Sequence, residues 1–401
     1  MSCKEWKEYK IDEVYKVSNG LSKKREEFGF GYEFLTFTDV FNNYFVPKKL
    51  DNLVNSSEKE REKCSIKRGD VFLTRTSEKL DELGRSCVAL KDYENATFNG
   101  FTKRLRPKGN IEILPEYAGY YFRSPKFRNL VTSMSSMTTR ASLNNDMLSV
   151  LTITVPPVDE QQKIANILSS LDDKIELNNE MNKTLEEMAQ SIFKRWFVDF
   201  EFPNEDGEPY KSSGGEMVDS ELGMIPKGWE VKELGDAVEF KYGKMPKKTE
   251  IVDEGYPIFS GYKITGYYKN FMFEEPQLIV VARGVGGTGD VKFSPPKCYL
   301  TNLSIAILLS NNYKIREYLY YYLKKSNLKM LDTGSAQSQI TIANLSKFKI
   351  VNPSNEIIEK FHTFICSIFK SKDDISLENE QLTSIRDSLL PKLMSGEIRL
   401  K

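Results

Sequence analysis

Residues 156–196 read PPVDEQQKIANILSSLDDKIELNNEMNKTLEEMAQSIFKRW, and this stretch decides the fold class. Asp159 is a suitable helix N-cap, with Gln162 three residues later as its capping-box partner. Beyond it, side chains suited to a helix seam recur at alternating intervals of four and three residues, and they include Ile164, Leu168, Leu171, Ile175, Asn182, Leu185 and Ile192. Such spacing over several heptads is typical of a coiled coil. We therefore expect a long helix over residues 156–200.

The same pattern returns 197 residues later, over residues 354–401. Its seam positions include Phe361, Ile365, Ile368, Asn379, Leu382 and Leu389. Asn182 and Asn379 are equivalent in the two copies, and a buried Asn at such a position sets the register of a coiled coil. Because the chain supplies two such helices, we expect them to form an antiparallel coiled coil. The open alternative is that each helix packs only on its own globular block.

The blocks that precede the two helices also resemble each other. Residues 6–11 (WKEYKI) match residues 229–234 (WEVKEL) at an offset of 223, and residues 71–75 (VFLTR) match residues 279–283 (IVVAR), which pairs Arg75 with Arg283. Tyrosines at 117, 120 and 121 match those at 318, 321 and 322. Residues 44–47, 70–74 and 151–155 read as strands, and residues 117–122 and 317–323 as short helices.

We therefore predict an α+β protein built as an internal pseudo-twofold repeat. Two similar mixed α/β domains, residues 1–155 and 223–353, are separated by the two long helices. Residues 201–222 begin with a polar stretch rich in Pro, Gly and Ser, which predicts a linker.

The amino-acid composition favours some classes of function and argues against others. The formal net charge is zero, but residues 1–155 carry 26 basic and 21 acidic side chains, and residues 223–353 carry 18 and 12. Basic blocks are typical of polyanion-binding surfaces. Five scattered cysteines without Cys-x-x-Cys argue against a disulfide framework or a zinc site, and predict a reducing, cytoplasmic location. A single histidine, His362, argues against histidine-based hydrolysis and multi-histidine metal sites.

One glycine-rich motif resembles a dinucleotide-binding loop but lacks the helix that should follow it. Gly284-Val-Gly-Gly-Thr-Gly289 fits the dinucleotide-binding pattern, yet residues 290–296 (DVKFSPP) cannot form the helix that would hold a pyrophosphate. We interpret it as a loop between strands. No P-loop pattern and no credible catalytic centre is found, so the sequence favours recognition over chemistry.

Basic side chains interleaved with Gly, Ser and aromatic residues are the better functional signal. Lys and Arg supply affinity for phosphates, and Arg and Gln can discriminate bases. The candidate DNA-binding residues are Lys23, Lys24, Arg25, Arg75, Arg85, Lys103, Arg104 and Arg140 in the first block and Lys244, Lys247, Lys248, Lys263, Arg283 and Gln337 in the second.

This organisation resembles the DNA specificity subunit of type I restriction-modification systems. The resemblance covers essentially the whole chain, and its most specific part is the helix entry Pro-Pro-x-x-Glu-Gln-x-x-Ile at residues 156–164. The second copy departs from this motif, because Ile357-Ile358 replaces Glu-Gln.

The resemblance implies that each globular block is a target recognition domain that reads one half of a bipartite, asymmetric site in double-stranded DNA. The paired helices would set the gap and dock two methyltransferase (modification) subunits, which bind S-adenosylmethionine and methylate adenine at N6. Restriction subunits that use ATP and Mg²⁺ would translocate and cleave the DNA. No cofactor or metal, no catalytic residue and no membrane contact is expected on this chain.

Two other functions stay open from the sequence. One is a coiled-coil scaffold that binds proteins without reading DNA, and selective, salt-dependent DNA binding would separate it from our interpretation. The other is a DNA-modifying enzyme with an unrecognised site, which an assay without partner proteins would test.

Overall fold

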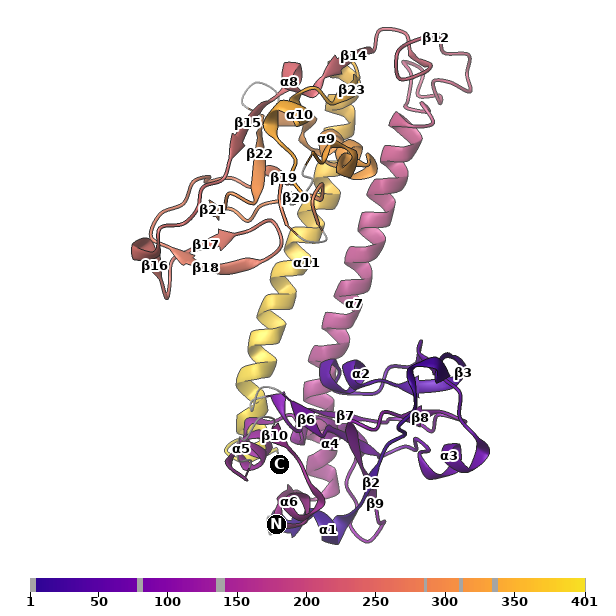
Figure 1. The fold of residues 1–401 in the computed structure, drawn as a ribbon, viewed down its shortest axis with the longest axis vertical. Coiled ribbons are helices and arrows are strands. Elements are labelled where there is room, and N and C mark those ends of the chain that lie inside the picture. Colours follow the sequence, from indigo (N-terminus) through magenta and orange to yellow (C-terminus); the bar gives the residue numbers. More distant parts are fainter. Residues whose placement is uncertain are drawn as a thin grey trace. The chain divides into compact units, whose positions relative to one another are not determined.

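The computed structural model describes residues 5–77, 82–134, 141–284, 287–309, 313–333 and 338–400. The chain forms two compact units (Figure 1), of which unit 1 comprises Met1–Asn179 with Ser376–Lys401 and unit 2 comprises Glu180–Ile375. Each unit holds one globular block and a part of both long helices, α7 (Val158–Phe197) and α11 (Asn355–Ser395). The unit boundaries therefore lie inside the two helices.

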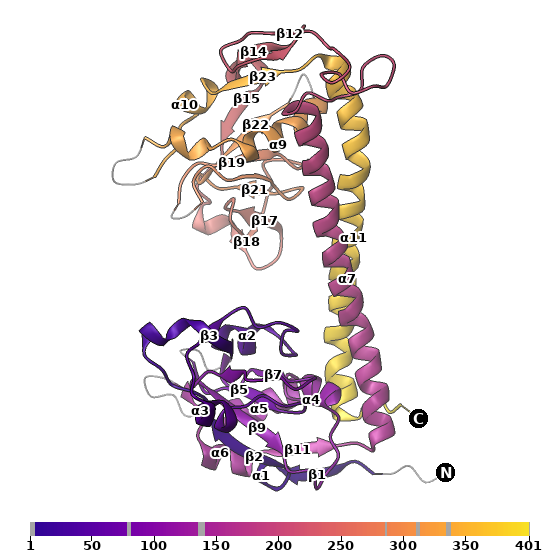
Figure 2. The same ribbon diagram turned by 90° about the vertical axis from the view of Figure 1, so that its right-hand side faces the viewer.

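The two helices run antiparallel within each unit (Figure 2). In unit 1, Arg386 Nη1 lies 2.7 Å from Asp172 Oδ1, and Asn178 Nδ2 lies 2.9 Å from Asn379 Oδ1. In unit 2, Lys372 Nζ lies 2.6 Å from Glu186 Oε2. Residue numbers rise along one helix as they fall along the other, so the predicted antiparallel pair is confirmed. Both helices also pack on globular blocks, which makes them part of the two cores.

Unit 1 is a mixed α/β block built on a four-stranded sheet of order β2-β9-β5-β7 and a three-stranded sheet of order β4-β3-β8. Its elements are β1 (Lys7–Lys10), α1 (Ile11–Val14), β2 (Tyr15–Asn19), η1 (Arg25–Glu27), β3 (Phe28–Leu35), α2 (Phe37–Asn42), β4 (Leu53–Val54), α3 (Glu58–Lys63), β5 (Val71–Thr74), β6 (Thr76–Ser77), β7 (Ser86–Val88), β8 (Thr97–Phe98), β9 (Thr102–Pro107), α4 (Pro115–Tyr121), α5 (Pro125–Met134), β10 (Ala141–Ser142), α6 (Asn145–Val150) and β11 (Thr152–Val155).

Unit 2 repeats this plan with four-stranded sheets of order β15-β22-β19-β20 and β16-β18-β17-β21. Its elements are β12 (Met217–Val218), β13 (Ile225–Pro226), β14 (Glu230–Glu233), α8 (Leu234–Ala237), β15 (Glu239–Tyr242), η3 (Lys248–Glu250), β16 (Ile251–Val252), β17 (Tyr256–Phe259), β18 (Ile264–Tyr268), β19 (Leu278–Val281), β20 (Val291–Phe293), β21 (Tyr299–Leu300), β22 (Ser304–Leu308), η4 (Tyr313–Ile315), α9 (Arg316–Lys325), η5 (Leu328–Leu331), α10 (Ile342–Ser346) and β23 (Lys349–Asn352).

The repeat extends to strand register. β1 pairs antiparallel with β11 so that Lys7 lies opposite Val155, and β14 pairs with β23 so that Glu230 lies opposite Asn352. These partners are related by the offsets of 223 and 197 found in the sequence. In both units this ladder leads directly into a long helix, and the internal repeat is confirmed.

The repeated tyrosines hold the strand that precedes each long helix. In unit 1 the Tyr117 hydroxyl donates to Thr154 O over 3.1 Å, and Thr154 N–H donates to the Tyr121 hydroxyl over 2.9 Å. In unit 2 the hydroxyl of Tyr318 donates to Val351 O, and Val351 N–H donates to the hydroxyl of Tyr322. The predicted short helices are thus confirmed as α4 and α9, and their tyrosines attach them to β11 and β23.

The proposed equivalence of Arg75 and Arg283 is wrong by one residue. Arg75 N–H donates to Phe101 O, and Arg75 O accepts from the N–H of Leu143. In unit 2 the residue with both of these bonds is Ala282, whose N–H donates to Leu303 O and whose carbonyl accepts from the N–H of Ile340. The two strands carry similar apolar runs, so residue types alone did not define the register.

The predicted linker is folded against unit 2. The Phe202 ring stacks on Trp229 at 5.0 Å and on Tyr210 at 4.6 Å between centroids, and β12 pairs with β13. The polar composition of the segment gave no sign of this packing, which depends on the aromatic rings of Phe202 and Tyr210.

Two local expectations are also wrong. Residues 44–47 form no strand, since only Phe45 makes an isolated bridge, to Val88. Helix α7 begins at Val158, so Asp159 lies in its first turn rather than at the cap, and the carbonyl of Pro157 accepts the first N–H groups. Among the described residues, no helix is long and apolar enough to cross a membrane.

Candidate nucleic-acid interface

The predicted DNA-binding residues differ in their access to solvent. Lys24, Arg25 and Arg75 in unit 1 and Lys244, Lys247, Lys248 and Lys263 in unit 2 are exposed, whereas Arg85 and Arg283 are half-buried. Arg140 and Gln337 lie outside the described residues. Arg85 places its guanidinium over the Phe41 ring at 4.7 Å, which orients it without neutralising its charge.

Lys23 is held by two carboxylates. Its ammonium lies 3.0 Å from Glu27 Oε1 and 3.0 Å from Glu60 Oε1. The hydrogen bonds that Lys23 donates, to Glu27 first and then to Glu60, raise its pKa. Because its charge is matched locally, Lys23 is a poor candidate for a phosphate contact.

Lys103 and Arg104 are buried rather than exposed, and their assignment as DNA contacts stays a prediction. Their exposed fractions are 5% and 6%. Arg104 Nη1 donates to Ser65 O over 2.6 Å, and its guanidinium lies over the Phe98 ring. Neighbouring strand residues point to opposite faces, so β9 buries one cation on each side. Sequence alone could not show this, because most Lys and Arg residues are exposed.

Buried Lys103 organises an edge of unit 1 that could read DNA. Its ammonium donates to Asn19 Oδ1 and Asn145 Oδ1, both over 2.7 Å. Burial and then the positive charge of Arg75 lower the pKa of Lys103, which places these two cations near one another. Arg75 N–H donates to the carbonyl of Phe101, whose ring is 63% exposed. This unit 1 edge therefore combines an exposed Arg and an exposed aromatic ring with ordered amides, which are groups that contact bases and phosphates.

Unit 2 has different chemistry at the same place. Asn19 lies opposite Lys103 in the unit 1 sheet, and Tyr242 lies opposite Ile305 in the unit 2 sheet. Asn145 corresponds to Ile342, whose N–H donates to the Tyr242 hydroxyl over 3.0 Å. The Lys–Asn network of unit 1 is thus replaced by a tyrosine and two apolar residues.

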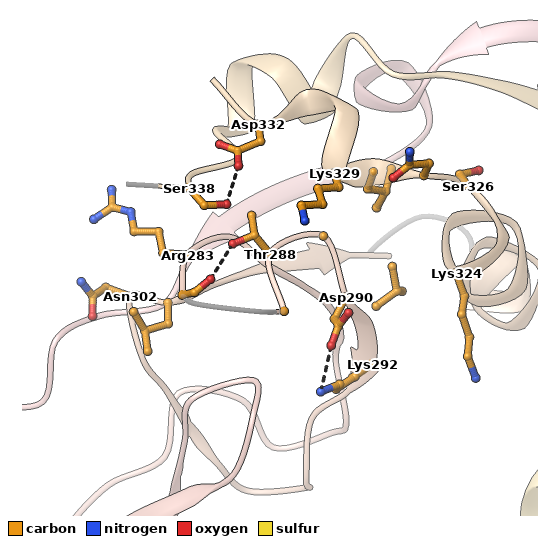
Figure 3. A pocket seen from close by; sticks show the side chains of 17 residues that line it. Arg283, Thr288, Asp290, Lys292, Asn302, Lys324, Ser326, Lys329, Asp332 and Ser338 are labelled. Atoms are coloured by element: carbon orange, nitrogen blue, oxygen red, sulfur yellow. Dashed lines mark hydrogen bonds and ion pairs between the residues drawn. The ribbon is translucent and has the colours of Figure 1, made fainter. Parts of the chain in front are cut away.

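A pocket of about 1070 Å³ lies in unit 2 beside the glycine-rich turn (Figure 3). The turn joins β19 to β20, so the interpretation of Gly284–Gly289 as a loop between strands is confirmed for its described residues. Thr288 Oγ1 donates to Gly284 O over 3.0 Å. The opposite wall includes η5, and Figure 3 shows the Lys329 side chain directed toward the Thr288 turn.

The pocket has an excess of positive charge. Among the described residues the lining includes Arg283, Lys292, Lys324 and Lys329 and two carboxylates, and Lys324 Nζ also lies 3.0 Å from Glu186 Oε1 outside the lining. Asp290 lies 3.4 Å from Lys292 Nζ, and Asp332 accepts from the side chain of Ser338 and from the N–H of Gln339. Arg283 Nε is buried and has no hydrogen-bond partner among the described residues. This unit 2 pocket is therefore suited to an anionic, hydrogen-bonding ligand such as a nucleic-acid backbone.

Several of these groups escaped sequence analysis. Asn19, Phe101, Asn145, Asn302 and Lys329 carry no distinctive spacing, and they come together only through sheet pairing and loop packing. A single exposed Asn or Lys is ordinary surface in a sequence.

All predicted seam residues are buried or half-buried. In unit 1, Asn379 bonds to Asn178 and Asn179 of the facing helix. Asn182 Oδ1, in unit 2, is buried without a partner among the described residues.

Comparisons with known proteins agree with the duplicated plan. The family model described as "Type I restriction modification DNA specificity domain" matches residues 3–187 and again residues 226–386. The specificity subunit of the type I restriction enzyme HindI from Haemophilus influenzae is 27% identical over 472 aligned residues, which cover 98% of this chain and 100% of that protein. The MjaIX specificity subunit from Methanocaldococcus jannaschii is 28% identical over 426 residues, which cover 99% and 94%.

A solved structure shares the fold. The S subunit of a type I restriction-modification system from M. genitalium matches with a TM-score of 0.60 and 18% identity, covering 97% of this chain and 96% of that one. At this identity the likeness concerns the fold alone.

Proposed function

Because this chain belongs to the family of type I restriction-modification DNA specificity domains, we propose that it is the subunit that gives such a complex its sequence specificity. Each unit reads one half of a bipartite site in double-stranded DNA. The observation that carries this proposal is the duplicated ladder, β1 with β11 and β14 with β23, which builds the same reading scaffold twice on one chain.

The two half-sites differ in sequence. Unit 1 offers Arg75 beside the Lys103–Asn19–Asn145 network, whereas unit 2 offers Arg283 and the unit 2 pocket. Side chains that differ in their donors and acceptors prefer different base edges. An asymmetric target is therefore the expected outcome.

The paired helices α7 and α11 set the unread gap between the half-sites. Support comes from their continuity over 40 and 41 residues and from the ion pairs and amide bonds that join them within each unit. Each residue added to a continuous helix lengthens it by about 1.5 Å.

Two methyltransferase subunits dock on repeat-equivalent surfaces of the helices. Met188 of unit 2 and Ile385 of unit 1 are 197 positions apart, and they are 49% and 47% exposed. Exposed apolar side chains at equivalent places are suited to two copies of one partner. S-adenosylmethionine, adenine N6 methylation, and the ATP- and Mg²⁺-dependent steps of a restriction subunit belong to these partners.

The test lengthens both helices at the unit boundaries. One heptad is inserted after Asn179 and one after Ile375, because seven residues keep the seam in phase. Each helix grows by about 10 Å, or about three base pairs at ~3.4 Å each. Selection of bound sequences from random DNA by the assembled complex should give two short motifs whose spacing increases by about three base pairs.

The half-sites themselves should stay unchanged, because the insertions touch neither sheet. A single contiguous motif, or new half-sites in the lengthened protein, would contradict the proposal. The chain purified without partners serves as a control and should neither methylate nor cleave DNA.

A further inference from the structure

Glu317, His362 and Cys366 form a cluster in unit 2 that DNA reading does not use. Glu317 lies in the first turn of α9 and is completely buried, whereas His362 and Cys366 are half-buried on one face of α11, one turn apart. His362 Nδ1 lies 2.7 Å from Glu317 Oε2, and Cys366 Sγ lies 3.5 Å from His362 Nδ1. One potential ligand atom from each residue lies within 4.8 Å of the others.

Arg316 binds one carboxylate oxygen of Glu317, and the other oxygen faces the cluster. Its Nε and Nη2 both donate to Glu317 Oε1, over 3.0 and 2.8 Å. The buried carboxylate therefore has its charge balanced on one side, while Oε2 faces the imidazole. A nitrogen, a sulfur and an oxygen thus converge from two helices.

We propose that this cluster binds a Zn²⁺ ion through Glu317 Oε2, His362 Nδ1 and Cys366 Sγ. Bond lengths of about 2.0–2.1 Å to N and 2.3 Å to S in a tetrahedral site place the two ligand atoms about 3.5 Å apart. Cys366 Sγ lies 3.5 Å from Nδ1 and 3.4 Å from Nε2, so the sulfur faces the imidazole ring rather than one of its nitrogens. The N and O ligands should be about 3.3 Å apart, so rotation of the imidazole away from Glu317 is the adjustment required. Thiolate and imidazole ligands favour Zn²⁺ over Mg²⁺ or Ca²⁺.

Binding exchanges a proton for the metal. A cysteine thiol binds Zn²⁺ as the thiolate, so Cys366 must give up its proton. The metal takes the thiolate, and the thiol proton leaves to solvent on the half-exposed side of the cluster. His362 must then carry its ring proton on Nε2, because the Nδ1–H that donates to Glu317 Oε2 in the free protein would block the metal. The ion would cross-link α9, whose tyrosines hold β23, to the long helix α11.

At the equivalent positions unit 1 keeps the carboxylate but lacks the imidazole and the thiol. Glu317 corresponds to Glu116, which pairs with Arg68 Nη2 at 2.8 Å. His362 and Cys366 correspond to Ala165 and Ser169. A metal site is therefore expected in unit 2 alone, and unit 1 supplies substitutions that an equivalent helix already accommodates.

The experiment titrates the full-length, chelator-treated protein with Co²⁺ as a spectroscopic probe and then with Zn²⁺. We expect one equivalent of Co²⁺ to produce thiolate-to-metal charge-transfer absorption in the near ultraviolet and tetrahedral visible bands, which Zn²⁺ then abolishes. Cys366→Ser should remove the charge-transfer band. His362→Ala should weaken binding more than about tenfold, since loss of even an outer partner of a metal ligand costs about 10- to 100-fold.

Glu116→Gln is the matched control in unit 1 and should keep the full signal. Absence of the band in the wild-type protein at one equivalent would overturn the proposal. So would a charge-transfer band that persists in Cys366→Ser. These readouts do not involve DNA, so their failure would leave the proposed function standing.

Discussion

The two units use opposite chemistry to attach the Trp-led strand to the long helices. In unit 1 the attachment is ionic, because Trp6 Nε1 donates to Glu160 Oε2 over 2.9 Å and Arg399 Nε donates to Glu160 Oε1 over 2.7 Å. Glu160 is 5% exposed, so this is a largely buried carboxylate.

In unit 2 the same positions are apolar. Trp229 is equivalent to Trp6, Ile357 to Glu160 and Phe202 to Arg399, at the offsets of the repeat. All three are buried in one hydrophobic core, and Phe202 stacks on Trp229. The departure of the second copy from the Glu-Gln motif is therefore compensated in space.

A second site follows the same rule. Asp172 and Arg386 form an ion pair in unit 1, and their equivalents in unit 2 are Phe369 and Ala189. Buried charges are present or absent as pairs because one left alone is costly. The comparison teaches that the scaffold tolerates either chemistry as long as both partners change together.

The largest expected effect comes from removing one partner of each attachment. Arg399→Ala should destabilise unit 1 by about 3 kcal/mol, the low end for a broken buried pair, because the Arg399 side chain is 37% exposed. Phe202→Ala should destabilise unit 2 by about 3 kcal/mol through the cavity that it leaves. Hydrogen exchange in β1/β11 and β14/β23 measures each effect in its own unit.

Low pH should distinguish the ionic attachment of unit 1 from the apolar attachment of unit 2. Below the pKa of Glu160 the carboxyl group is neutral, so the penalty of Arg399→Ala should shrink, whereas that of Phe202→Ala should not. An equal change in both penalties at low pH would contradict the ionic assignment in unit 1.

A double substitution tests whether the apolar attachment can replace the ionic one. Glu160→Ile combined with Arg399→Phe gives unit 1 the residues of unit 2 and should leave stability within about 1 kcal/mol of wild type or higher, since apolar replacement of a buried pair is often neutral or stabilising. Each single substitution should be worse than the pair, which denaturation of all three variants measures.

The pH dependence should change as well. Burial pushes the pKa of Glu160 upward, but hydrogen bonds from Arg399 and Trp6 outweigh it, and the net shift is downward from 4.5. A lowered folded-state pKa contributes stability that is present above about 4.5 and lost as pH falls through the folded value. The paired variant should lack this contribution, and an unchanged acid transition would contradict the assignment.

The smallest effect concerns DNA. Arg75→Ala should reduce the slope of log affinity against log salt concentration by about 1 if Arg75 contacts a phosphate. Lys23→Ala should leave the slope nearly unchanged, because Glu27 and Glu60 already neutralise Lys23. Binding isotherms at several salt concentrations distinguish the two, and a larger change for Lys23 would contradict the interface described above.

Sequence reasoning succeeded where a feature is periodic or duplicated. The seams of α7 and α11 follow heptad spacing, and the tyrosines of α4 and α9 recur with the strands that they hold. It failed where one contact decides the environment of a residue. Lys103 and Arg104 look like surface cations, yet β9 is the second strand of a four-stranded sheet and both of its faces are covered.

The duplicated architecture, the two long helices and the family can be predicted from the linear chain, because hydrophobic periodicity and repeat offsets are properties of the sequence. The three-dimensional packing is needed to show which charges are buried, which Asn pairs across the helices, and which loops form the unit 2 pocket. Those outcomes depend on contacts between residues more than a hundred positions apart, such as Glu160 with Arg399, and no local pattern encodes the desolvation that such contacts impose.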